Sequence, residues 1–135
     1  MKFDISFETI INYDPGDPGI SLDIQLKIDR TGESILAKLD TGSTHCIFAR
    51  SHGEDIGLDI ESGEPLTIST VRGSFLTYGH PLTVIAAGFE LDSMVFFAAD
   101  ENIKVSVLGR RGWLDRIVVG INDYDGKLYL SPYNQ

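Results

Sequence analysis

The chain has 135 residues, of which 42% are hydrophobic and 23% are charged, an ordinary composition for one folded domain. Its formal net charge of −9 at pH 7 argues against nucleic-acid binding, since no stretch resembles a basic phosphate-binding face. The single cysteine, Cys46, excludes an internal disulfide, and no apolar run approaches the roughly 18 residues of a membrane span. Asp4 stands where a signal peptide has its apolar region, so we expect a cytoplasmic protein.

Alternating apolar and polar residues predict strands in the first part of the chain. Phe3 to Glu8 and Ile20 to Ile28 alternate in the way that half-buried strands do. Between them, Asn12 to Gly19 contains two prolines and two glycines, which indicates a loop. Asp29 to Glu33 predicts a turn, after which Ile35 to Leu39 forms another strand that leads directly to an aspartate.

The remainder of the chain predicts short strands with little helix. Ala49 to Ile56 fits a short helix, and Arg110 to Arg116 fits a helical turn. The predicted strands are Leu66 to Val71, Ser74 to Tyr78, Leu82 to Ala86, Ser93 to Ala98, Val105 to Leu108, Ile117 to Ile121 and Lys127 to Leu130. The first two form a hairpin around Arg72-Gly73, and the last two pair across Asp125-Gly126, a preferred tight-turn dipeptide. This pattern predicts a mostly β fold, a closed or nearly closed β-barrel with one or two short helices.

No internal repeat divides the sequence, so we expect one domain over residues 1–135. Residues 1–19 would form an N-terminal strand and loop, and residues 20–131 the core. Trp113 and Leu114 are interpreted as core residues. The three histidines are scattered, and the acidic loops lack the spacing of a calcium loop. We therefore expect no metal ion and no cofactor.

The residues Asp40-Thr41-Gly42-Ser43 form the candidate site. Asp40 follows a strand and precedes Gly42, where the backbone can turn sharply and present a carboxylate. Asp, Gly and Ser are also common in ordinary turns, so these four residues alone fit a plain turn. Two features favour a functional loop: apolar segments flank it on both sides, and Val107-Leu108-Gly109 follows far downstream.

This order of features resembles the retropepsin-like aspartic peptidases, and in particular their prokaryotic single-domain members. The resemblance rests on Leu39 to Ser43, then a central hairpin, then Val107 to Arg110 before a short helix. It covers about Ile20 to Leu130 and implies an acid-protease β-barrel. The longer string Leu108 to Arg116, a Leu-Gly-Arg segment followed by an aromatic-Leu-Asp helix, resembles the prokaryotic members most.

The resemblance also implies roles for single residues. Asp40 would be the catalytic aspartate, Thr41 would join two loops across a two-fold axis, and Gly42 would offer backbone to the substrate. Ser43 would hydrogen-bond the ionised carboxylate and lower the pKa of the pair, which suggests an acidic optimum. The segment Val107, Leu108 and Gly109 would pack beneath the site. The hairpin tip at Val71, Arg72 and Gly73 would be a flap. It lacks the glycine-rich tip of retroviral members, so an ordinary surface hairpin is the alternative interpretation.

The number of catalytic motifs predicts the assembly. Peptide hydrolysis by acid and base needs two carboxyl groups, and two of them about 3 Å apart share one proton. The chain holds one Asp-Thr-Gly, so a homodimer must supply the second Asp40. We therefore expect a homodimeric aspartic endopeptidase whose Asp40 pair activates a water molecule to hydrolyse a peptide or protein substrate, with neither nucleic acid nor membrane as partner.

Two other functions fit the same sequence. One is a retropepsin-like binding or scaffold domain with little or no peptidase activity, and the other is an unrelated β-barrel interaction module in which Asp40 to Ser43 is only a turn. His45 is interpreted as a structural or surface residue, with an influence on specificity as the alternative. Arg110 is interpreted as a structural arginine that ties the following helix to carboxylates or backbone.

Overall fold

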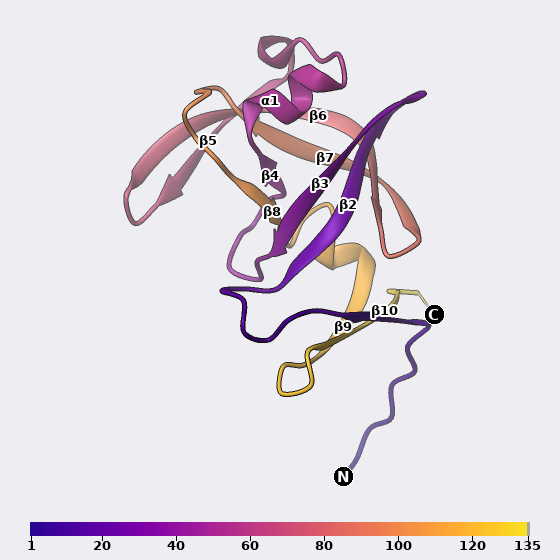
Figure 1. Ribbon diagram of the computed structural model, residues 1–135. Coiled ribbons are helices and arrows are strands. Elements are labelled where there is room, and N and C mark those ends of the chain that lie inside the picture. Colours follow the sequence, from indigo (N-terminus) through magenta and orange to yellow (C-terminus); the bar gives the residue numbers. More distant parts are fainter. Residues whose placement is uncertain (135) are drawn as a thin grey trace.

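The computed structural model describes residues 1–134, and strands make up most of it (Figure 1). Strands account for 53% of the chain and helices for 9%, which confirms the predicted mostly β class. The strands are β1 (Thr9–Asn12), β2 (Ser21–Ile28), β3 (Thr31–Leu39), β4 (Ile47–Phe48), β5 (Glu64–Thr70), β6 (Gly73–Ala86), β7 (Phe89–Ala98), β8 (Ser106–Leu108), β9 (Ile117–Asn122) and β10 (Lys127–Pro132).

Helical structure is confined to short segments. The α-helix α1 (Arg50–Asp55) matches the predicted helix, and the 3₁₀ turn η2 (Leu114–Arg116) lies within the predicted helical turn. A second 3₁₀ turn, η1 (Ile60–Ser62), follows α1. Within residues 1–134 none of these helices has the length and apolar character to cross a bilayer.

Six strands close into the predicted barrel. They follow the order β2-β3-β8-β4-β7-β6, and β6 pairs back with β2. The pairs β3–β8 and β4–β7 are parallel, and the other pairs are antiparallel. Leu22, Ile24 and Leu26 of β2 are buried while Asp23 between them is exposed, as the alternation predicts. Each such buried aliphatic side chain contributes roughly 1.5–3 kcal/mol to folding.

The first and last strands of the chain form a second sheet of order β1-β10-β9. In Figure 1 this sheet lies at the opposite end of the barrel from α1. Leu128 and Leu130 of β10 are fully buried and belong to the same core as the barrel strands. The sheet therefore covers one end of the barrel rather than forming a separate core. Trp113 is also fully buried, and Leu114 packs against the core, so both expectations are confirmed.

The strand predicted over Phe3 to Glu8 is wrong. The structure has no strand before Thr9 within its described residues, and Phe3 and Ile5 remain 82% and 61% exposed. Alternation alone cannot make a strand where no neighbouring strand accepts its hydrogen bonds. Only Phe7 at the end of this segment packs, with its ring 5.6 Å from that of Tyr129.

Two other boundaries differ from the prediction. The turn after β2 occupies Asp29 and Arg30 alone, so β3 starts earlier than expected, at Thr31. The strands predicted on either side of Pro81 are one continuous strand, β6. On one edge of β6, β5 pairs with it only as far as Gly79, and β2 pairs with it only from Thr83 onward. Neither strand reaches Pro81, so no neighbour on that edge needs the backbone N–H that proline lacks.

Tyr13 ties the loop after β1 to the turn between β9 and β10. Its hydroxyl donates to Asp123 Oδ1 at 2.7 Å. Burial, followed by the hydrogen bond and the charge of Asp123, raises the pKa of Tyr13 to about 12. The stabilising contribution of this contact is thus complete below the tyrosine's ordinary pKa near 10 and is lost as the pH rises through about 12.

Replacing Asp123 by asparagine should lower the pKa of Tyr13 because the negative charge beside the hydroxyl is removed. The measurement is a spectrophotometric tyrosinate titration, with Tyr13→Phe identifying the transition that belongs to Tyr13. Asp125→Asn, in the same turn, is the control and should leave the Tyr13 titration in place. An Asp123→Asn protein whose Tyr13 transition does not move would contradict the contact.

Candidate active site

Asp40 directly follows β3, at the point where β3 runs parallel to β8. Leu39 pairs with Leu108 in this ladder, and the N–H of Asp40 donates to the carbonyl of Leu108 at 3.0 Å. The chain then turns away through Thr41 and Gly42, both of which are exposed. The buried strand pair thus presents a half-buried carboxyl group on an exposed loop.

Hydrogen bonds within the loop orient the Asp40 carboxylate. The N–H of Gly42 donates to Asp40 Oδ1 at 2.9 Å, and the N–H of Ser43 donates to the Asp40 carbonyl at 3.2 Å. A carboxylate that accepts from the residue two positions on is the bond of an ordinary Asx turn. These bonds therefore fit both a plain turn and a catalytic loop, and the difference lies in what surrounds them.

The segment Val107 to Gly109 lies against the Asp40 loop. Leu108 and Gly109 are buried. A Cβ atom on Gly109 would lie 2.7 Å from the carbonyl oxygen of Ser43 and closer still to that of His45. No larger residue fits against these two carbonyls, so glycine is required here for a close backbone approach rather than for its φ angle.

Backbone bonds continue this contact beyond Gly109. The N–H of Arg110 donates to the Ser43 carbonyl at 2.9 Å, and the N–H of Arg111 donates to the Thr44 carbonyl at 2.8 Å. The loop is therefore held along its length by a second, distant segment of the chain. An isolated surface turn would lack this support.

Cys46 fills the space between the two segments. Its Sγ accepts from the Gly109 N–H at 3.4 Å and donates to the Arg111 carbonyl at 3.6 Å. Burial raises the pKa of the Cys46 thiol to about 11, against a smaller lowering by the Gly109 N–H. The thiol is thus protonated at neutral pH, so Cys46 is a small buried residue rather than a nucleophile.

A cleft of about 820 Å³ separates the Asp40 loop from the β5–β6 hairpin. Its polar lining comes from Asp40, Gly42, Ser43, Thr44, His45, Thr67, Ser69 and Thr70, and its apolar lining from Ile47, Leu66, Ile68, Val71, Phe75, Ile103, Val105 and Val107. The hairpin thus faces the aspartate across an open space. That volume lies in the ordinary range of ligand-binding clefts.

The predicted flap residues do not all face the cleft. Val71 lines it and is fully exposed at the tip of the hairpin, whereas Arg72 and Gly73 are not among the lining residues. Within the tip, the Thr70 hydroxyl donates to the Gly73 carbonyl at 2.9 Å and accepts from the Arg72 N–H at 3.2 Å. The hairpin tip is therefore closed by its own hydrogen bonds.

Sequence reasoning missed most of the apolar wall. Leu66 and Ile68 of β5 face the cleft together with Phe75 of β6, and the loop before β8 adds Ile103 and Val105. A signal was present in β5, where half-buried Leu66 and Ile68 alternate with exposed residues. It was ambiguous, because a strand facing a core shows the same alternation as one facing a cleft.

The Ser43 hydroxyl is not directed at the Asp40 carboxylate as expected. It donates to the carbonyl of His45 at 2.7 Å. A serine hydroxyl has one proton to donate, so in this conformation Ser43 stabilises the loop rather than the ionised carboxylate. The expectation of a lowered pKa through this bond therefore has no support from the geometry.

His45 is half-buried in the wall of the cleft. Its ring packs against that of Phe96 in an edge-on arrangement, with centroids 4.8 Å apart. Burial, followed by the positive charge of Arg111, lowers the pKa of His45 from its ordinary value of 6.5. The ring is therefore neutral at pH 7 in the free protein.

Replacing Arg111 by alanine should raise the pKa of His45, but not to its ordinary value, because burial is the larger cause and persists. The measurement is an NMR titration of the His45 ring protons in the wild type and in Arg111→Ala. His52→Gln serves to assign the resonances. An unchanged His45 titration in the variant would show that Arg111 does not lie near the ring.

Arg110 does not make the predicted tie to a carboxylate. Its side chain is exposed and forms no ion pair with any residue of 1–134. Asp115, the acidic residue nearest in sequence, accepts from the N–H of Gly112 at 3.0 Å instead. What Arg110 contributes to the turn is its backbone, since its carbonyl accepts from the N–H of Asp115 at 2.8 Å.

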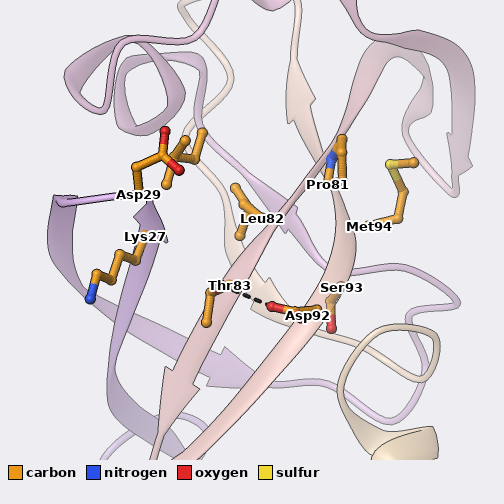
Figure 2. Close-up of a pocket in the computed structure, with 9 residues that line it drawn as sticks. Lys27, Asp29, Pro81, Leu82, Thr83, Asp92, Ser93 and Met94 are labelled. Atoms are coloured by element: carbon orange, nitrogen blue, oxygen red, sulfur yellow. Dashed lines mark hydrogen bonds between the residues drawn. The ribbon is translucent and has the colours of Figure 1, made fainter.

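A second concavity, of about 470 Å³, lies between the end of β2 and the β6–β7 hairpin (Figure 2). Figure 2 shows Thr83 bonded to Asp92, a contact of 3.0 Å, while the Lys27 amine points away from both. Its polar groups do not converge on a common point, and the Asp40 loop takes no part in it. It therefore lacks the features of a catalytic site.

One group within residues 1–134 has donor atoms close enough to hold a metal ion. Its members are Glu33, His52 and Asp55, whose donor atoms lie within 4.8 Å of one another. Glu33 Oε1 is 3.0 Å from His52 Nδ1, and Asp55 is exposed. A Glu33–His52 hydrogen bond accounts for the contact between its two inner members.

Comparison with known proteins supports the fold. No protein-family model and no curated protein sequence matches the chain. Among solved structures, the chain is similar to the EIAV protease complexed with the inhibitor HBY-793, at a TM-score of 0.57 and 19% sequence identity. The match covers 74% of this chain and 88% of that chain. The likeness confirms the predicted retropepsin-like β-barrel.

Proposed function

We propose that the chain is an aspartic endopeptidase that acts as a homodimer, with one Asp40 from each subunit. One observation carries the proposal: Asp40 lines a cleft and faces a hairpin across it. The retropepsin-like fold and the match to a viral protease agree with this reading. A plain turn would need neither the cleft nor the close packing of Gly109 under the loop.

The need for a second subunit follows from the chemistry. Among residues 1–134, Asp40 is the one carboxylate that lines the cleft. Hydrolysis requires a base to take a proton from water and an acid to give one to the carbonyl oxygen. Thr41 and Gly42 are exposed beside Asp40, so a second copy can approach the loop from this side. A two-fold axis beside these residues would bring the two carboxyl groups together.

In the dimer the two Asp40 carboxyl groups would share one proton and titrate as a pair. The ionised group takes a proton from a water molecule between them, and that water attacks the scissile carbonyl carbon. The protonated group donates to the carbonyl oxygen, which gives a tetrahedral diol. The group that took the proton from water then gives it to the amide nitrogen while the other takes back a hydroxyl proton, so the C–N bond breaks, the amine leaves and the pair again shares one proton. No covalent enzyme intermediate forms. The Gly42 N–H holds Asp40 Oδ1 in place, which keeps the carboxylate from rotating away from the axis.

The test is cleavage of a denatured mixed-protein substrate between pH 3 and pH 8, with and without a statine-type transition-state mimic. Sedimentation velocity over a range of concentrations measures the dimer in the same buffers. We expect cleavage that the mimic blocks and specific activity that rises with the dimer fraction. A protein that stays monomeric at high concentration and cleaves nothing would contradict the proposal. Peptide binding without cleavage would support the alternative of a binding or scaffold domain.

A further inference from the structure

The wall of the cleft has an uneven distribution of charge. In the described part of the chain its lining is apolar or carries hydroxyl groups, with two titratable exceptions, Asp40 and His45. Asp40 belongs to the proposed chemistry, whereas His45 has no role in it. The His45 ring is therefore available to contact a substrate side chain.

Arg111 stands beside His45. The two residues form an isolated parallel β-bridge, and the N–H of Arg111 donates to the carbonyl of Thr44 at 2.8 Å. Paired residues of a β-bridge project their side chains toward the same side. His45 lines the cleft and Arg111 does not, so the Arg111 side chain leaves the backbone at the edge of the cleft, next to His45. The effect of the Arg111 charge on His45 agrees with this proximity.

The guanidinium of Arg111 is available for a ligand. Arg111 is exposed and has no ion-pair partner in the described part of the chain. The nearby Asp115 bonds the Gly112 N–H instead. The Arg111 guanidinium therefore has no carboxylate partner among the described residues. Its planar donors match the two oxygens of a carboxylate.

We propose that His45 and Arg111 together bind an acidic side chain of the peptide substrate. This inference rests on the proposed peptidase function and adds a substrate class to it. Arg111 would hold the carboxylate with paired N–H donors, and the His45 ring would add a third donor from within the cleft. In a two-fold symmetric dimer each half of the cleft has one such corner. An acidic residue is therefore favoured on both sides of the scissile bond.

The test compares fluorogenic peptides that differ only in glutamate or glutamine at each position around the scissile bond. For the wild type, kcat/KM should be about tenfold higher with glutamate at the preferred position, as a charged hydrogen-bonded pair would give. Arg111→Ala should reduce this ratio to about twofold or less, and Arg111→Lys should restore part of it. Arg110→Ala is the matched control, because it removes the same charge one residue away and should keep the ratio. Thermal denaturation verifies that each variant is folded.

The outcomes separate the two proposals. Equal kcat/KM for glutamate and glutamine peptides in an active wild type would overturn the acidic subsite and leave the peptidase intact. If no peptide is cleaved, the peptidase fails, and fluorescence anisotropy on Asp40→Asn tests the subsite alone. Tighter binding of the glutamate peptide, lost in Asp40→Asn/Arg111→Ala, would then support the subsite. Equal binding of both peptides would overturn it.

Discussion

Asp40→Asn should lower kcat/KM for peptide cleavage by at least about 10³-fold, because an amide can neither take a proton from water nor share one with its partner. The fold should persist, since the asparagine side-chain oxygen can still accept from the Gly42 N–H as Asp40 Oδ1 does. The measurement is steady-state cleavage of a fluorogenic peptide together with the melting temperature. We expect loss of activity with a melting temperature within a few degrees of the wild type.

Mixed dimers sharpen this result. If each site uses one Asp40 from each subunit, an excess of Asp40→Asn chains should inhibit the wild type by forming inactive heterodimers. Asp23→Asn is the matched control. Asp23 is exposed on β2 and lies outside the cleft, so this substitution removes the same charge without changing the cleft. Activity that survives in Asp40→Asn, or inhibition equal to that by Asp23→Asn, would rule out a shared pair of aspartates.

Gly109→Ala should destabilise the protein by about 3 kcal/mol, near the upper end for overpacking a buried site. The added Cβ would overlap the carbonyl oxygens of Ser43 and His45, and both are backbone atoms that cannot rotate away. For a domain of this size, the loss corresponds to a decrease in melting temperature of about 10 °C. Relief of the overlap would push the Asp40 loop outward, so we expect activity to fall together with stability.

Gly32→Ala is the control for this substitution. There the added Cβ meets only the end of the flexible Gln25 side chain, which can move. We expect a change in the free energy of unfolding within about 0.5 kcal/mol. Chemical denaturation of both variants gives the comparison, and equal stability for Gly109→Ala and Gly32→Ala would show that the contact under the loop is not tight.

Local pattern predicted much of the fold because the strands that close the barrel have one buried face. The alternation of Leu22, Ile24 and Leu26 located β2, and the dipeptides at Arg72-Gly73 and Asp125-Gly126 located two hairpins. The same alternation at Phe3 to Glu8 led to a wrong prediction, because a pattern of apolar and polar residues does not reveal whether a neighbouring strand is available for pairing. The continuity of β6 through Pro81 was likewise hidden, since it depends on which neighbours flank that residue.

The site was harder to predict from the sequence than the fold was. Asp40 and the distant segment at Gly109 carried a motif, and the structure places them in contact. The bond from Ser43 to the His45 carbonyl was not predictable, because a hydroxyl can choose between several acceptors within one turn. The position of Arg111 beside His45 depends on a single bridge between residues far apart in sequence. No periodic pattern of apolar and polar residues predicts such a contact.

The pairing of β1 with β10 also has a consequence for the order of folding. The N–H of Glu8 donates to Ser131 Oγ, a contact between residues 123 positions apart. The β9–β10 hairpin closes across a short turn, whereas β1 must bring distant parts of the chain together, which is slow. On the ribosome, β1 emerges early and waits for β10 to be made. We therefore expect β1 to join the native structure last, and its amide protons to exchange faster than those of β9 and β10.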